Sequence, residues 1–162
     1  MMWVLRGRNL KGLEDMSANL IFLLVAALAG MTMAIQGTFN SSLGKVIGLW
    51  EATFVVHLMG TVIVALLLWG LRLGQGNFGV YAEAPWYTYL GGVLSVVIIY
   101  TVVVSIPKLG VCNATTAIIV GQVLTACIID HLGLFGAKKL AMGWSQLAGL
   151  GLLAAGAKLL LK

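Results

Sequence analysis

Long apolar runs separated by short polar segments dominate the pattern along this chain. Five such runs are present, covering roughly Leu20–Ile35, Ala52–Leu71, Trp86–Ile106, Val111–Ile129 and Leu140–Leu161. A helix that crosses a hydrocarbon core of about 30 Å needs about 20 apolar residues, because each residue adds about 1.5 Å. The runs lack the alternation of apolar and polar residues that is typical of barrel strands. Inside lipid, a helix satisfies the hydrogen bonds of its own backbone groups. The pattern therefore predicts an all-α membrane protein, a bundle of five transmembrane helices over roughly 19–37, 51–72, 86–106, 111–130 and 140–161.

The polar segments between the runs are too short to form a separate soluble domain. We expect residues 1–17 to be an N-terminal juxtamembrane extension and residues 18–162 to be one transmembrane domain. The first run is expected to be retained as a helix, because no A-x-A-like cleavage site follows it. Pro107 is expected to end the third helix, since the residue before a proline disfavours the helical region.

An odd number of crossings would place the two chain ends on opposite sides of the membrane. Two copies could then form an inverted pair, a common construction in transporters. Six lysines and arginines fall on the side of the N-terminus, and four fall on the other side. This excess weakly places the N-terminus in the cytoplasm. If translation starts at Met16, the bias vanishes, and dual topology and a single fixed orientation stay equally open.

The composition supports a membrane protein and excludes several functional classes. The chain is 60% hydrophobic and 9% charged, whereas soluble domains are about 25% charged. The net charge of +5 comes from basic residues at the ends of the runs, and no basic patch with interleaved aromatics predicts nucleic-acid binding. No nucleophile–base pair, metal-ligand spacing or glycine-rich phosphate loop is present. We therefore expect no enzyme activity, no catalytic residue, no metal site and no cofactor.

Polar residues recur on single faces of three predicted helices. Such residues are costly in lipid, so these faces should point toward protein or a water-filled cavity. The cavity interpretation predicts a substrate site, and the alternative is hydrogen bonding between helices. For Asn40, capping of the helix end is a further alternative. For His57, the further alternative is a structural role as a neutral, hydrogen-bonded side chain. The candidate substrate-binding residues are Gln36, Asn40, His57, Gly121 and Gln122.

Three further polar residues lie near the ends of predicted helices and are candidates for coupling or gating. Glu51 begins the second helix, where an acid also favours the positive end of the helix dipole. Asp130 and His131 end the fourth helix, where a carboxylate opposes the dipole and could pair with Lys138 or Lys139. No carboxylate lies at the centre of a predicted helix. That absence argues against a simple proton antiporter built on a buried acid.

Small residues recur at spacings of four in three predicted helices. This spacing places them on one face and lets helix backbones approach closely, either within the bundle or in a dimer. The ladders consist of Ala26, Gly30 and Ala34; Ala117, Gly121 and Thr125; and Ser145 with Gly149 and Gly151 with Ala155.

Four segments resemble a known protein family. They are "GMTMAIQGTFNSSLG", "FVVHLMGTV", "IPKLGVCNATTAIIVGQVLTACIIDHLGLFG" and "SQLAGLGLLAAGAKLL". On these residues the chain resembles the YdcZ-like branch of the drug/metabolite transporter superfamily, over roughly Asn19 to Leu161. The family pattern covers Gln36, Asn40, Gly121, Gln122, Asp130, His131 and Gly133.

The resemblance implies a five-helix unit that is half of a ten-helix inverted-repeat transporter. It also implies a multi-pass protein of the bacterial inner membrane that pairs, inverted, with itself or with a paralogous five-helix protein. The expected function is export of a small polar or cationic metabolite by alternating access. The alternative is a membrane assembly or regulatory subunit that does not transport. Small multidrug transporters carry a glutamate inside their first helix; this chain has none there, which argues against drug-for-proton exchange of that type.

Overall fold

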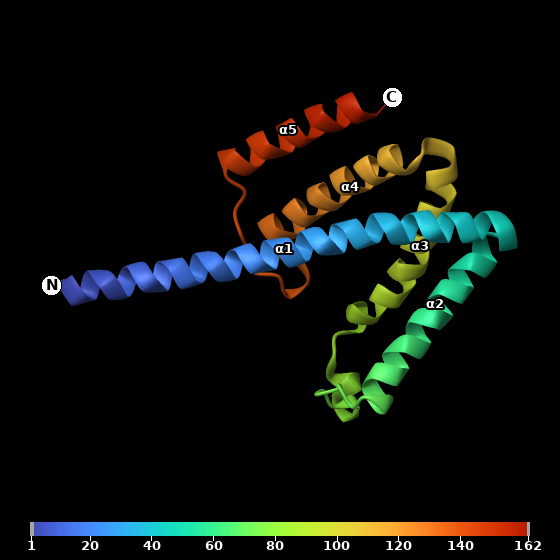
Figure 1. Cartoon of the computed structure of the whole chain (residues 1–162), viewed down its shortest axis with the longest axis horizontal. Helices are drawn as coiled ribbons and strands as arrows, with labels where there is room; N and C mark the ends of the chain where they lie inside the picture. Colours follow the sequence, from blue (N-terminus) through green and yellow to red (C-terminus); the bar gives the residue numbers. More distant parts are fainter. Residues whose placement is uncertain (1, 162) are drawn as a thin grey trace. The chain divides into compact units, whose positions relative to one another are not determined.

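The computed structural model describes residues 2–161, with side chains described from residue 19 onward. It contains no strand within these residues and has five α-helices (Figure 1). These are α1 (Met2–Ile47), α2 (Leu49–Ala65), α3 (Leu90–Leu109), α4 (Val111–Leu132) and α5 (Trp144–Leu160). Four short elements join them: the π-helix η1 (Leu66–Gly70) and the 3₁₀ helices η2 (Phe78–Glu83), η3 (Trp86–Tyr89) and η4 (Leu134–Gly136). The all-helical class predicted from the apolar runs is confirmed.

Two helices extend further than the sequence pattern predicted. The first was expected to end near residue 37, but α1 continues to Ile47 and stops at Gly48, whose φ is 104°. The third was expected to end at Ile106, but α3 passes Pro107 and ends at Leu109. A proline in the last turn removes only its own N–H, and the Gly110 amide still donates to the Ile106 carbonyl at 2.9 Å.

The fifth helix is shorter than predicted. It begins at Trp144 rather than near residue 140. The preceding residues are held against the end of α4, because the Leu140 amide donates to the Asp130 carbonyl at 2.8 Å. The Met142 amide donates to Nδ1 of His131 at 3.2 Å. These bonds hold residues 140–142 against the end of α4, and the helical conformation begins only after them.

Four helical segments are long and apolar enough to cross a membrane. They are Asn19–Ile47, Leu49–Gly70, Trp86–Leu109 and Val111–Leu132. The 17 residues of α5 span only about 26 Å at about 1.5 Å per residue, slightly less than the hydrocarbon core. The structure therefore supports four membrane spans by length, and a fifth crossing stays a prediction.

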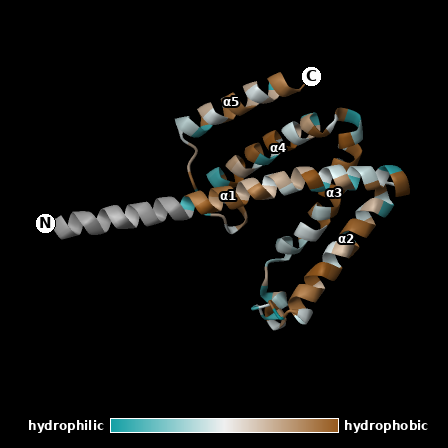
Figure 2. Ribbon diagram, in the orientation of Figure 1, coloured by the Kyte–Doolittle hydropathy of each residue, from teal (hydrophilic) through white to brown (hydrophobic). Residues whose placement is uncertain are grey.

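The solvent-accessible surface is far larger than that of a water-soluble monomer of this mass. It amounts to 12923 Å² for 17.1 kDa, whereas the usual scaling gives about 7,800 Å². Most large apolar side chains of the described helices are exposed, and Figure 2 shows hydrophobic colour along much of their length. Such a surface is stable only when lipid or another protein covers it.

The chain divides into two compact units, one ending at Gln36 and the other beginning at Gly37. In the second unit, α2 packs on α3, α3 on α4 and α4 on α5. Its most densely packed part lies near the turns at Gly48 and Gly110. There Val103 is fully buried, and Trp50 stacks on Tyr100 with ring centroids 4.4 Å apart. This packing fixes the ends of α2, α3 and α4 near the polar residues described next.

Glycine allows the last part of α1 to lie directly on α3. A Cβ atom added to Gly44 would lie 2.6 Å from Cγ1 of Val103. One added to Gly37 would lie 3.0 Å from Cγ1 of Val102 and 3.1 Å from Cδ1 of Ile106. Because Gly37 and Gly44 are seven residues apart, they share one face of the helix. This face brings the residues between them against α3.

Candidate functional site

Four polar side chains are buried in the second unit, although it has few buried side chains of any kind. They are Asn40, Ser41, Thr53 and Thr116, with exposed fractions of 2% to 9%. The Thr53 hydroxyl donates to the Leu49 carbonyl at 2.8 Å, so it is paired within its own helix.

Asn40, Ser41 and Thr116 differ from Thr53 in that their side chains have no hydrogen-bond partner within residues 19–161. No nitrogen or oxygen atom of a described side chain is both inaccessible and unpaired. The polar atoms of these three residues must therefore reach accessible space, although the residues themselves are at least nine-tenths buried. Unpaired polar atoms that face accessible space are available to a water molecule or a polar ligand.

His57 connects α2 to α3. Its Nδ1 lies 2.8 Å from the Thr53 carbonyl oxygen of its own helix. Its Nε2 lies 2.9 Å from the hydroxyl of Ser95 on α3. Ser95 was not predicted, and its one sequence signal is that it is a lone hydroxyl within the apolar stretch Val93–Val97. The two contacts hold the imidazole between the helices, as expected of a polar group within an apolar span.

Buried Asn40 and Thr116 and half-buried His57 lie at similar depths from the ends of their helices. Asn40 and His57 are eight and nine residues from Gly48, or about 12 and 14 Å along their helices. Thr116 is six residues from Gly110, or about 9 Å along α4. The second unit therefore has polar groups two to three turns inside the ends of these helices.

The other predicted substrate residues are exposed. Gln36 is the last residue of the first unit, and its side chain is exposed. Gly121 and Gln122 lie on α4, where both are exposed and a Cβ added to Gly121 would meet nothing within 4 Å. The convergence of all five predicted residues on one cavity stays a prediction.

The predicted coupling residues lie at helix ends. A Cβ added to Gly48 would lie 2.2 Å from a carboxylate oxygen of Glu51, so this side chain folds back over the first turn of α2, as the helix dipole favours. Asp130 forms no ion pair within residues 19–161, and the predicted pairing with Lys138 or Lys139 is wrong for the described chain. His131 accepts the hydrogen bond from Met142 and so connects α4 to the following loop.

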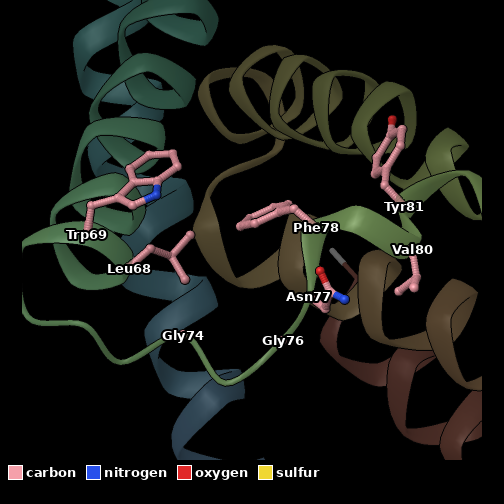
Figure 3. A pocket seen from close by; sticks show the side chains of 8 residues that line it. All are labelled: Leu68, Trp69, Gly74, Gly76, Asn77, Phe78, Val80 and Tyr81. Carbon is pink, nitrogen blue, oxygen red and sulfur yellow. The ribbon is translucent and has the colours of Figure 1, made fainter.

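A cavity of about 410 Å³ lies where α2 ends and the connection to α3 begins (Figure 3). Leu68 and Trp69 line it from η1, and Phe78, the first residue of η2, points toward them. Gly74, Gly76 and Asn77 also line it, and the side-chain oxygen Oδ1 of Asn77 already accepts a hydrogen bond from the Gly79 amide at 2.8 Å. Exposed aromatic residues at a helix end are typical of membrane-interface anchors, and this cavity contains none of the predicted substrate residues.

Comparisons with known proteins identify one family. A family model described as "Putative inner membrane exporter, YdcZ" matches residues 21–159. No curated protein and no solved structure gives a match. The family match covers all the predicted site residues and the residues that form the His57–Ser95 bridge.

Proposed function

Because this chain belongs to the YdcZ family of inner membrane exporters, we propose that it exports a small polar or cationic metabolite across the membrane. The proposal depends most on one observation. Asn40, Ser41 and Thr116 are buried in apolar helices, yet their polar atoms are unpaired and reach accessible space. Uncharged amide and hydroxyl groups of this kind bind polar or cationic molecules through hydrogen bonds.

Substrate binding is assigned to Asn40 and His57, with Gln36, Gly121 and Gln122 completing the site in the assembled transporter. Alternating access would follow from rocking of one five-helix unit against a second, inverted one. In the second unit, the small-residue faces of α4 and α5 have open space at Gly121, Gly149 and Gly151. A second copy or a paralogue could use these faces for close helix packing.

Replacing Asn40 with leucine is expected to reduce transport about tenfold, because a hydrogen bond to a charged ligand contributes roughly 1.5–3 kcal/mol. The assay measures flux of labelled ethanolamine, putrescine, choline and serine into vesicles that contain the purified protein. The matched control is Ser42→Ala, since Ser42 is exposed and its hydroxyl bonds only to the Thr38 carbonyl of its own helix. Flux of none of these probes through the unchanged protein would count against transport. Normal flux through N40L would exclude Asn40 from the site.

An inverted assembly is expected to cross-link unlike ends of α5. Ser145 and Lys158 lie near opposite ends of this helix, 13 residues apart, or about 20 Å along its axis. With Cys112 and Cys127 replaced by alanine, a copy carrying Ser145→Cys should cross-link to a copy carrying Lys158→Cys. Cross-links only between identical positions would show copies that face the same way, and would contradict the inverted assembly.

A further inference from the structure

The two contacts of His57 differ in what they allow its nitrogens to do. Nδ1 faces the Thr53 carbonyl at 2.8 Å, and a carbonyl oxygen only accepts hydrogen bonds. Nδ1 must therefore carry a hydrogen in every protonation state. Nε2 faces the Ser95 hydroxyl at 2.9 Å, and a hydroxyl can donate or accept. Nε2 can thus be either bare or protonated without losing its partner.

We propose that Nε2 of His57 is a proton-binding site, and that a bound proton and a cationic cargo exclude each other there. This inference deepens the proposed function, because it names the coupling ion of the same site. In the neutral state the Nε2 lone pair accepts a hydrogen bond from Ser95 or from an N–H group of the cargo. In the protonated state the imidazolium has no lone pair and repels a cation. Export of one ammonium group is thereby linked to entry of one proton.

Each hydrogen that moves when His57 gains or loses the proton has an acceptor. When Nε2 takes a proton, the Ser95 oxygen changes from donor to acceptor. Its own hydrogen turns to another acceptor, and the Gly91 carbonyl lies one turn earlier in α3, where helical serines commonly bond. When the cargo arrives, the Nε2 proton leaves to water, and an N–H group of the cargo occupies the freed lone pair. Apart from the Gly91 carbonyl, water and the cargo, no donor or acceptor is needed, and no group is oxidised or reduced.

The other ionisable groups of these helices lie several residues along the sequence from His57 and Ser95. On α2 the other titratable group is Glu51 in the first turn, six residues before His57. On α3, which packs against α2, Tyr100 stacks on Trp50 and Lys108 lies in the last turn. Tyr89 lies at the start of α3, and its hydroxyl donates to the Tyr81 carbonyl. On α1, Lys45 lies three residues before Gly48. Of the groups named here, His57 is the one whose ring nitrogen meets a hydroxyl of the neighbouring helix, at 2.9 Å.

Nitrogen-15 NMR of the full chain in lipid nanodiscs tests the proton site without any cargo. The sequence has two histidines, so His131→Gln leaves His57 as the single imidazole. We expect Nδ1 to stay protonated at every pH and Nε2 to gain a proton when the sample is acidified. An Nε2–H tautomer in the neutral state, or an Nε2 that stays bare after acidification, would overturn the proposal.

Variants of Ser95 test whether its hydroxyl holds the proton. Hydrogen bonds to a charged group are roughly twice as strong as neutral ones, so Ser95→Ala should weaken proton binding about fivefold. Ser95→Thr keeps the hydroxyl and should restore proton binding. Ser105→Ala is the matched control, because the Ser105 hydroxyl bonds to the Thr101 carbonyl within α3 at 2.7 Å. Equal titration in S95A and the unchanged chain would refute the role of Ser95.

Coupling is tested with vesicles that enclose a pH-sensitive dye. Ethanolamine, which has N–H donors, should move protons in the opposite direction, and His57→Gln should reduce this proton movement at least tenfold. Ethanolamine flux without proton movement would overturn the coupling and leave the proposed function intact. If no probe moves, the proposed function fails, and the NMR titration still decides whether His57 binds the proton.

Discussion

Vesicles containing His57→Leu are expected to transport cargo at least tenfold more slowly than the unchanged protein. Leucine removes both ring nitrogens, so the contacts to the Thr53 carbonyl at 2.8 Å and to Ser95 at 2.9 Å are lost. A hydrogen bond that involves a charged group contributes roughly 1.5–3 kcal/mol, or about 10- to 150-fold in affinity. Labelled ethanolamine and putrescine flux measures the loss, and gel filtration in detergent checks that the variant remains folded.

Thr61→Val is the matched control for the histidine substitution. Thr61 lies one turn further along α2, is exposed, and donates its hydroxyl to the His57 carbonyl at 2.8 Å. Its replacement removes a polar group from the same helix without touching the bridge to α3, so flux should stay within about twofold. Equal flux in H57L and the unchanged protein would show that the imidazole is a structural connection only.

Gly44→Val is expected to give the largest loss of stability among single substitutions in the second unit. The Cβ atom alone would lie 2.6 Å from Cγ1 of Val103, which is fully buried. The last part of α1 would have to move away from α3, and such overpacking costs about 1–3 kcal/mol. Thermal unfolding in detergent should therefore begin several degrees lower, since about 1 kcal/mol shifts the midpoint by about 2–4 °C in a chain of this size.

Two further variants make this result specific. Gly60→Val adds the same atoms to α2, where a Cβ would meet nothing within 4 Å, and should leave the midpoint nearly unchanged. Val103→Ala combined with Gly44→Val removes the clashing methyl groups and should restore part of the loss, giving a coupling of at least about 0.5 kcal/mol. Equal midpoints for the Gly44 and Gly60 variants would refute the close approach of α1 and α3.

Several features of the site were predictable because they depend on residue type. His57 is a polar residue within an apolar run and Asn40 follows the end of one, and the cost of polar groups in lipid makes such residues visible in any sequence. Ser95 and Thr116 were missed because single hydroxyl residues are common in membrane helices, where they bond to their own helix. Only the position of α3 beside α2 shows that Ser95 faces His57.

The packing of α1 also depends on helix positions that residue types do not reveal. The ladder of Ala26, Gly30 and Ala34 lies in the first unit and stays a prediction, whereas Gly37 and Gly44 of the same helix lie on α3. A sequence reveals which faces are small, but several faces of one helix can be small at once. Which face is used depends on the crossing of two helices, and this crossing is absent from the linear pattern.

The apolar runs by themselves determined that this protein is helical and embedded in a membrane, because hydrogen-bond pairing in lipid leaves few alternatives to a helix. They did not determine where the helices end. The hydrogen bond from the Gly110 amide to the Ile106 carbonyl lets α3 continue past Pro107. The hydrogen bonds of the Leu140 and Met142 amides hold the segment before α5 against the end of α4. The tertiary structure alone decided that His57 holds Ser95 and that Gly44 touches Val103. Contacts between distant segments depend on the orientation of each helix about its own axis, and apolar surfaces facing lipid constrain that orientation only weakly.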